Sequence, residues 1–100
     1  MDLIELKQSA EQAKAFLQAL ANQDRLLLLC ALTQQEYTVG ELEQQLGILQ
    51  PTLSQQLTVL RNEGLVDVRK EGRYHYYRVS DERVKAVLGL LYQFFCQKEK

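Results

Sequence analysis

The chain has 100 residues, of which 46% are hydrophobic and 25% charged, a composition typical of one folded domain and not of a disordered chain. Its longest apolar run, Leu26 to Leu32, is far shorter than the roughly 20 residues of a membrane-spanning helix, and no secretory signal begins the chain. We therefore expect a cytoplasmic protein without a membrane partner. The net charge of −1 does not by itself suggest a nucleic-acid partner, but the charges are unevenly distributed along the chain.

Two helices are predicted in the first third of the chain. Residues 4–21 are amphipathic, with apolar side chains at helical spacing and charged side chains between them. A second helix is predicted over residues 23–34, with Asn22 as its N-cap. This second helix has leucine on nearly every side, which predicts a central, buried position in the fold.

A helix-turn-helix is predicted next. Thr38 and Glu41 have the spacing of a capping box that opens a helix over residues 39–46, and Gly47 ends this helix. The following helix covers residues 51–63 and has one narrow apolar stripe. That stripe consists of Leu53, Leu57 and Leu60.

A β-hairpin is predicted after the helix-turn-helix, because the hydrophobic period changes from about 3.6 to about 2 at Gly64. Residues 65–79 contain the β-branched and aromatic side chains that favour strands. We expect the tight turn of the hairpin at Glu71 and Gly72.

The last predicted helix covers residues 81–97 and has two apolar faces. One face is formed by Val84, Val87, Leu88, Leu91 and Phe95. Leu90 and Phe94 mark the other face. A chain of this size has a core for only one of them, so we expect a partner subunit to cover the second.

The order of these elements predicts the fold class. It is mainly α with a small β-hairpin, as in a winged helix-turn-helix that occupies residues 1–100 as a single domain. The first and last helices flank the helix-turn-helix and are available for dimerisation.

The outer face of helix 51–63 has the chemistry of a DNA-reading helix. It carries hydroxyl and amide side chains and none of the aromatic or apolar anchors that a protein-binding face uses. Gln55 and Gln56 can each read adenine through two hydrogen bonds, whereas Arg61 suits a phosphate. The candidate DNA contacts on this helix are Thr52, Ser54, Gln55, Gln56, Thr58 and Arg61.

The hairpin adds positive charge beside that face. Residues 1–50 have a net charge of −4, whereas residues 51–79 have a net charge of +2. A basic hairpin tip suits the DNA backbone or the neighbouring minor groove. The candidate DNA contacts on the hairpin are Arg69, Lys70, Arg73 and His75.

Five stretches of the chain occur in a characteristic order and spacing: ANQDRL (21–26), VGEL (39–42), PTLSQQL (51–57), LRNEGLV (60–66) and YYR (76–78). Together they resemble the ArsR/SmtB family of bacterial transcriptional repressors, over about residues 10–97. The resemblance implies a homodimer joined through the first and last helices and bound to operator DNA with dyad symmetry.

The resemblance also implies that Ser54, Gln55 and Gln56 lie in the recognition helix. One departure from the family is visible here, because its members usually have Ser-Gln-His at these three positions. The base preference at Gln56 is therefore not carried over from the family.

Metal sensing and catalysis are not expected. Helix 39–46 lacks the cysteines, and the last helix lacks the histidines, with which members of the family bind metals. One histidine and two cysteines cannot form a four-ligand soft metal site within one subunit. No carboxylate pair, glycine-rich phosphate loop or Cys–His arrangement indicates an enzyme, so no cofactor is predicted.

Cys30, in the second helix, and Cys96, at the end of the last helix, are the candidate sensing residues. The resemblance is closest to the sulfide- and persulfide-responsive branch of the family, which has one cysteine in each of these helices. It implies that reactive sulfur species, or another thiol oxidant, produce a disulfide or polysulfide bridge between the two helices. Such a bridge would release a repressor from its operator.

Three alternatives stay open. The cysteines are purely structural in the first, since free cysteine often behaves as a small buried hydrophobe. In the second, the winged-helix shape serves protein interaction without DNA binding. The third concerns the direction of regulation: proteins of the branch that the chain resembles can also act by displacing another silencing protein, and the output is then activation.

Overall fold

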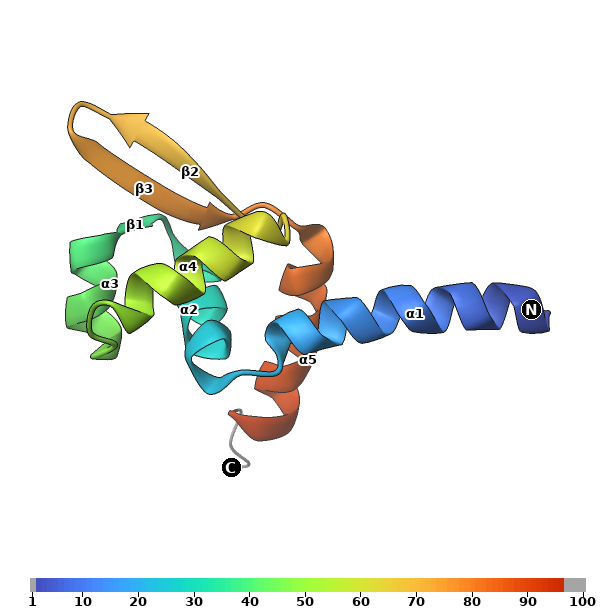
Figure 1. Cartoon of the computed structure of the whole chain (residues 1–100). Coiled ribbons are helices and arrows are strands. Elements are labelled where there is room, and N and C mark those ends of the chain that lie inside the picture. The colour runs from blue at the N-terminus through green and yellow to red at the C-terminus, as the bar shows by residue number, and fades with distance from the viewer. Residues whose placement is uncertain (1, 97–100) are drawn as a thin grey trace.

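The computed structural model describes residues 2–96, whose five helices and three strands follow the order of a winged helix-turn-helix (Figure 1). The elements are α1 (Leu3–Leu20), α2 (Gln23–Gln34), β1 (Tyr37–Thr38), α3 (Val39–Leu46), α4 (Thr52–Asn62), β2 (Val66–Glu71), β3 (Tyr74–Val79) and α5 (Glu82–Phe95). This arrangement confirms the predicted fold class.

Local capping signals set the bounds of α2 and α3, which agree with the prediction. The Asn22 side chain accepts a hydrogen bond from the Arg25 N–H at 3.0 Å, and Thr38 and Glu41 form the predicted capping box. Gly47 ends α3 with a φ of 71°, in the left-handed region that favours glycine.

The other helices differ from their predicted ranges by one or two residues. α1 begins and ends one residue earlier, and its N-terminal N–H groups are capped by Asp2. α4 is one residue shorter at each end. α5 begins after its N-cap, Asp81, and ends at Phe95, while the predicted final residue, Gln97, lies outside the described residues.

The wing is a three-stranded antiparallel sheet in the order β1-β3-β2. Glu71 pairs with Tyr74, so the turn consists of Gly72 and Arg73 and not of Glu71 and Gly72 as predicted. Gly72 has a φ of 63° whereas Arg73 has a negative φ, the pattern of a type II′ turn. The two-residue strand β1 was not predicted, because it is too short to show an alternating pattern.

Leucine side chains of α2, α3 and α4 supply most of the fully buried positions of the core. The side chains that are fully buried are those of Leu28, Leu29, Leu42, Leu53, Leu57, Leu60, Leu65 and Val84. Each buried leucine contributes about 1.5–3 kcal/mol through removal from water. α2 lies at the centre and contacts the other four helices and β3. The prediction that α2 is buried on nearly every side is wrong, because Leu27 and Cys30 are exposed.

α1 projects from the rest of the molecule as an arm (Figure 1). Only Ala19 and Leu20, at its C-terminal end, are buried in this helix, and Phe16 is half-buried. Leu3 and Ile4 are 75% and 71% exposed. The apolar stripe of α1 is therefore not covered by the core of its own chain.

α5 also leaves apolar side chains in solvent. Val84 and Leu88 are buried, as predicted for its inner face, and Leu90 and Phe94 are exposed. The assignment of Phe95 to the inner face is wrong, because this side chain is 80% exposed at the end of the helix.

Candidate DNA interface and thiol pair

The outer face of α4 presents polar side chains to solvent. Ser54, Gln55 and Thr58 are exposed, Arg61 is exposed near the C-terminal end of the helix, and Thr52 is half-buried in its first turn. The apolar side of α4 is fixed in the core, so this face is held on a rigid element. Among these polar groups, the Thr58 hydroxyl donates to the Ser54 carbonyl at 2.9 Å.

Gln56 differs from its neighbours on α4. It is half-buried, and its Oε1 accepts a hydrogen bond from Arg25 Nη1 at 2.8 Å. Only its amide N–H groups are without a hydrogen-bond partner within the described residues. The structure thus brings Ser54, Gln55 and Thr58 together on the open face and holds Gln56 at its inner margin.

The sequence predicts almost no apolar surface on this face, and the structure shows one small exception. Val59 is 37% exposed on α4, and Leu49, just before the helix, is 65% exposed. Val59 is thus the one exposed large apolar side chain within α4, because Leu49 lies outside the helix. The described part of α4 has no exposed aromatic residue.

The basic side chains of the wing differ in whether an acidic side chain of the same chain pairs with them. Lys70 pairs with His75 across the two strands, next to Arg73 in the turn, and all three are exposed. Arg69 instead donates two hydrogen bonds to Glu36, at 2.8 and 3.0 Å, and also pairs with Glu71. The positive charge of Arg69 is therefore compensated within the chain, which removes it from the predicted basic tip.

Glu36 connects the wing to the loop between α2 and α3. Its second carboxylate oxygen lies 3.8 Å from Arg78 Nη1, and the Arg69 guanidinium also lies over the Tyr76 ring at 4.7 Å. The hydrogen bonds from Arg69, followed by the positive charges of Arg69 and Arg78, lower the pKa of the Glu36 carboxyl. Glu36 stays ionised at neutral pH and holds the base of the wing.

Sequence reasoning missed both Arg25 and Glu36. Each makes a side-chain contact with a residue more than 30 positions away, Arg25 with Gln56 and Glu36 with Arg69. Helical periodicity and capping patterns report only neighbours along the chain. Arg25 lies inside one of the stretches that carry the family resemblance, and this was the one signal that pointed to it.

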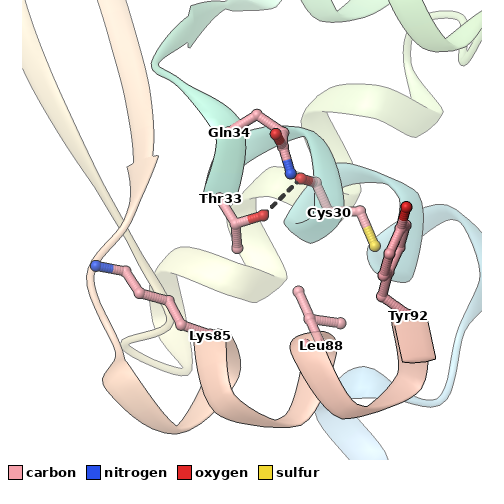
Figure 2. A pocket seen from close by; sticks show the side chains of 7 residues that line it. Cys30, Thr33, Gln34, Lys85, Leu88 and Tyr92 are labelled. Atoms are coloured by element: carbon pink, nitrogen blue, oxygen red, sulfur yellow. Dashed lines mark hydrogen bonds between the residues drawn. The ribbon is translucent and has the colours of Figure 1, made fainter. Parts of the chain in front are cut away.

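Cys30 lies beside an open cavity of about 510 Å³ between α2 and α5. Figure 2 shows its sulfur near the Tyr92 ring, with Leu88 below and Lys85 at the other end of the cavity. The Cys30 carbonyl accepts a hydrogen bond from the Thr33 hydroxyl at 2.7 Å. Cys30 is thus reachable from solvent and not in the buried position that its helix predicted.

Cys96 is the C-cap residue of α5 and is also exposed, and both thiols are free. Partial burial raises the pKa of the Cys30 thiol, and the negative charge of the Cys96 thiolate raises it further. Cys30 is therefore protonated at neutral pH.

No helix in residues 2–96 is long and apolar enough to cross a membrane. Nor does this part of the chain contain a group of three or more His, Cys, Asp or Glu side chains that could hold a metal ion.

Comparison with known proteins places the chain among bacterial regulators. The family model of bacterial regulatory proteins of the arsR family matches residues 22–68. The biofilm growth-associated repressor of Xylella fastidiosa is 42% identical over 96 residues, which are 96% of this chain and 84% of that protein. The transcriptional activator HlyU of Vibrio cholerae is 42% identical over 97 residues, 97% of this chain and 90% of that protein.

Solved structures give the same result. The transcriptional regulator HlyU from Vibrio vulnificus superimposes with a TM-score of 0.89 at 44% identity, covering 96% of this chain and 100% of that one. These proteins are transcriptional regulators and not enzymes. With its winged helix-turn-helix, its polar recognition helix and these relatives, the chain belongs to the arsR family of DNA-binding bacterial regulatory proteins.

Proposed function

We propose that this chain is a homodimeric transcriptional repressor that leaves its operator when Cys30 and Cys96 are oxidised by reactive sulfur species. The observation that carries the proposal is the solvent-open cavity beside Cys30, between the helix-turn-helix core and the helix that ends at Cys96. The protein acts in the cytoplasm, where thiols are reduced at rest.

In this proposal the DNA contacts come from α4 and the wing tip. Ser54, Gln55 and Thr58 face the bases, and Thr52 and Arg61 contact the backbone. Lys70, Arg73 and His75 meet the neighbouring phosphates or minor groove. Gln56 has only its amide N–H groups free for a base, and Arg69 contributes little because Glu36 and Glu71 compensate its charge.

The dimer is proposed to form through α1 and α5. The exposed large apolar side chains of these helices are Leu3, Ile4, Leu6, Leu17, Leu90, Tyr92, Phe94 and Phe95. So many apolar side chains on two helices exceed what a monomer leaves in water. A second copy that covers them places two α4 helices on one face of the dimer, as a dyad-symmetric operator requires.

The sulfur chemistry has two balanced steps. One cysteine thiolate attacks the outer sulfur of a persulfide RSSH, the S–S bond breaks, and the thiol RSH leaves with one proton. The cysteine then carries an extra sulfur, and the second thiol attacks the inner sulfur and displaces hydrogen sulfide. Two thiols are oxidised to a disulfide while the sulfane sulfur is reduced to sulfide.

A bridge between the two thiols ties α5 to α2. α5 also carries part of the proposed dimer surface, so its position determines the spacing between the two recognition helices. Both half-sites must be reached together, and a changed spacing lowers operator affinity.

The test is binding of DNA from upstream of the protein's own gene, measured by fluorescence anisotropy on reduced and persulfide-treated protein. Intact mass spectrometry on the same samples reports bridging. Tight binding when reduced, lost together with formation of a Cys30–Cys96 bridge, is expected. Cys30→Ser and Cys96→Ser should each bind when reduced and resist release.

Three other outcomes separate the alternatives. Unchanged binding after treatment assigns the cysteines a structural role. No binding of that fragment or a wider DNA pool, in either state, favours a protein-interaction module. The relative from Vibrio cholerae is named an activator, which supports a second direction of regulation. If that holds, the protein raises transcription only from DNA coated with a silencing protein.

A further inference from the structure

The Arg25 guanidinium joins three helices in one planar group. Its Nε donates to the Ala19 carbonyl at 2.6 Å, and its Nη2 donates to the Gln18 carbonyl at 3.2 Å. Its Nη1 donates to Gln56 Oε1 at 2.8 Å. Arg25 belongs to α2, the two carbonyls end α1, and Gln56 belongs to α4.

The contacts with α1 provide hydrogen-bond donors and positive charge at the C-terminal end of that helix. The last carbonyl groups of a helix lack intrahelical partners and form its negative end, which favours a cation. The last turn of α1 has no basic residue of its own. Arg25 supplies the missing charge, and the Asn22 cap on its backbone N–H fixes the turn from which its side chain extends.

The contact with α4 fixes the orientation of Gln56. Because an arginine side chain only donates hydrogen bonds, the amide atom that faces it must be the oxygen. Gln56 is half-buried there, whereas Gln55 beside it is exposed. A glutamine that reads adenine uses its oxygen and its amide nitrogen together, and at Gln56 the oxygen is already engaged.

We propose that Arg25 is a positioning residue that sets the angle of α4 against the end of α1, with Gln56 as its acceptor in place of a base. The inference rests on the proposed DNA binding of α4. Since α1 carries part of the proposed dimer surface, a shift of α1 in the dimer reaches the recognition helix through this guanidinium. Arg25 and Gln56 then act on DNA affinity as one unit.

A double-mutant cycle on operator binding by the reduced protein tests this. Arg25→Met and Gln56→Met should each weaken operator binding by about tenfold, the scale of one hydrogen bond to a charged group. The double variant should also lose about tenfold, because the second change removes nothing further. As a matched control, Gln55→Met combined with Arg25→Met should lose about a hundredfold, since those two residues act separately.

Thermal unfolding without DNA separates positioning from a purely structural role. A structural role lowers the melting temperature and leaves the affinity of the folded fraction unchanged, and this result would overturn the proposal. If Arg25→Met does not fold, Arg25→Lys replaces it, because lysine lacks the rigid planar fork with which Nε and Nη1 of Arg25 reach Ala19 and Gln56.

The cycle also distinguishes this inference from the proposed function. Wild-type protein that binds no operator overturns the proposed function, and the positioning role with it. Wild-type protein that binds, with losses at Arg25 and Gln56 that multiply, overturns only the inference, because Gln56 then acts on the DNA independently of Arg25.

Discussion

The interior formed by α2, α3 and α4 and the outer surfaces of α1 and α5 differ in how much of their apolar surface one chain buries. Leu28 of α2, Leu42 of α3 and Leu57 of α4 are almost or entirely without solvent contact. By contrast, Ile4 of α1 and Phe94 of α5 are each more than 60% exposed. The first region is covered by side chains of its own chain, whereas the second leaves its apolar side chains in solvent.

This difference in burial separates the part of the molecule that positions α4 from the surfaces that are open to partners. Buried leucines hold α4 rigidly and so fix the position of its polar face. The uncovered apolar faces, the polar face of α4 and the wing tip all lie open to solvent. In the proposed function, a second copy of the chain covers the apolar surfaces and DNA contacts the polar and basic ones.

The largest effect is expected inside the completed region. Leu28→Ala should lower the free energy of unfolding by about 2–5 kcal/mol, because it opens a cavity at the centre of the core. Leu27→Ala on the same helix is the matched control. It should lower the free energy of unfolding much less, because the Leu27 side chain is partly exposed. Chemical denaturation measures both, and equal losses would remove the contrast between the two sides of α2.

The next effect tests the uncovered region. Leu90→Asp should leave the folded monomer intact and prevent dimerisation, because it puts a charge into the proposed interface. Operator binding should then fall by roughly a hundredfold or more, since two linked half-sites bind much more tightly than one. Sedimentation velocity and anisotropy report the two quantities. Gln93→Asp adds the same charge to an exposed polar site of α5 and should change neither.

A smaller effect is expected on the polar face of α4. Gln55→Ala should weaken operator binding by about 1–3 kcal/mol and relax preference at one base pair. Binding to a set of operators with single base-pair changes measures this. An equal loss on the operator and on random DNA would show that Gln55 does not read a base.

The sequence predicted the fold well wherever the signal is local. Asn22, Thr38 with Glu41, and Gly47 set helix boundaries through contacts within a few residues, and these boundaries are correct. The burial of α2 was overestimated because composition does not say which neighbours a helix has. The hairpin turn was misplaced by one residue, since register depends on pairing across strands.

The candidate site could be predicted only in part for the same reason. Residue types on α4 indicate a DNA-reading face, but the engagement of Gln56 by Arg25 and of Arg69 by Glu36 depends on folding of the chain. Likewise, nothing in the spacing of the two cysteines shows that Cys30 opens onto a cavity.

The wing contains a direct comparison between a compensated and an uncompensated arginine. Arg73→Ala should lower the slope of log affinity against log salt concentration by about one unit, the share of one phosphate contact. It should weaken binding to operator and to random DNA alike. Arg69→Ala should change the salt dependence less, because Glu36 and Glu71 already pair with Arg69. Anisotropy titrations at several salt concentrations measure both slopes. Equal slopes for the two variants would contradict the conclusion that Glu36 and Glu71 compensate the charge of Arg69.

The smallest effect concerns the ion pairs of Glu36 that attach the wing. All partners in these ion pairs belong to the same chain. Hydrogen bonds from Arg69 lower the pKa of Glu36 in the folded protein, so its stabilising effect is full above the pKa of the unfolded chain. That effect is lost as the pH falls through the lowered folded pKa. Thermal unfolding of the wild type and of Glu36→Gln should therefore differ at neutral pH and converge in acid. The difference should be small, because both members of the ion pair are partly exposed. A difference that stays constant from neutral to acidic pH would mean that Glu36 acts through packing and not through its charge.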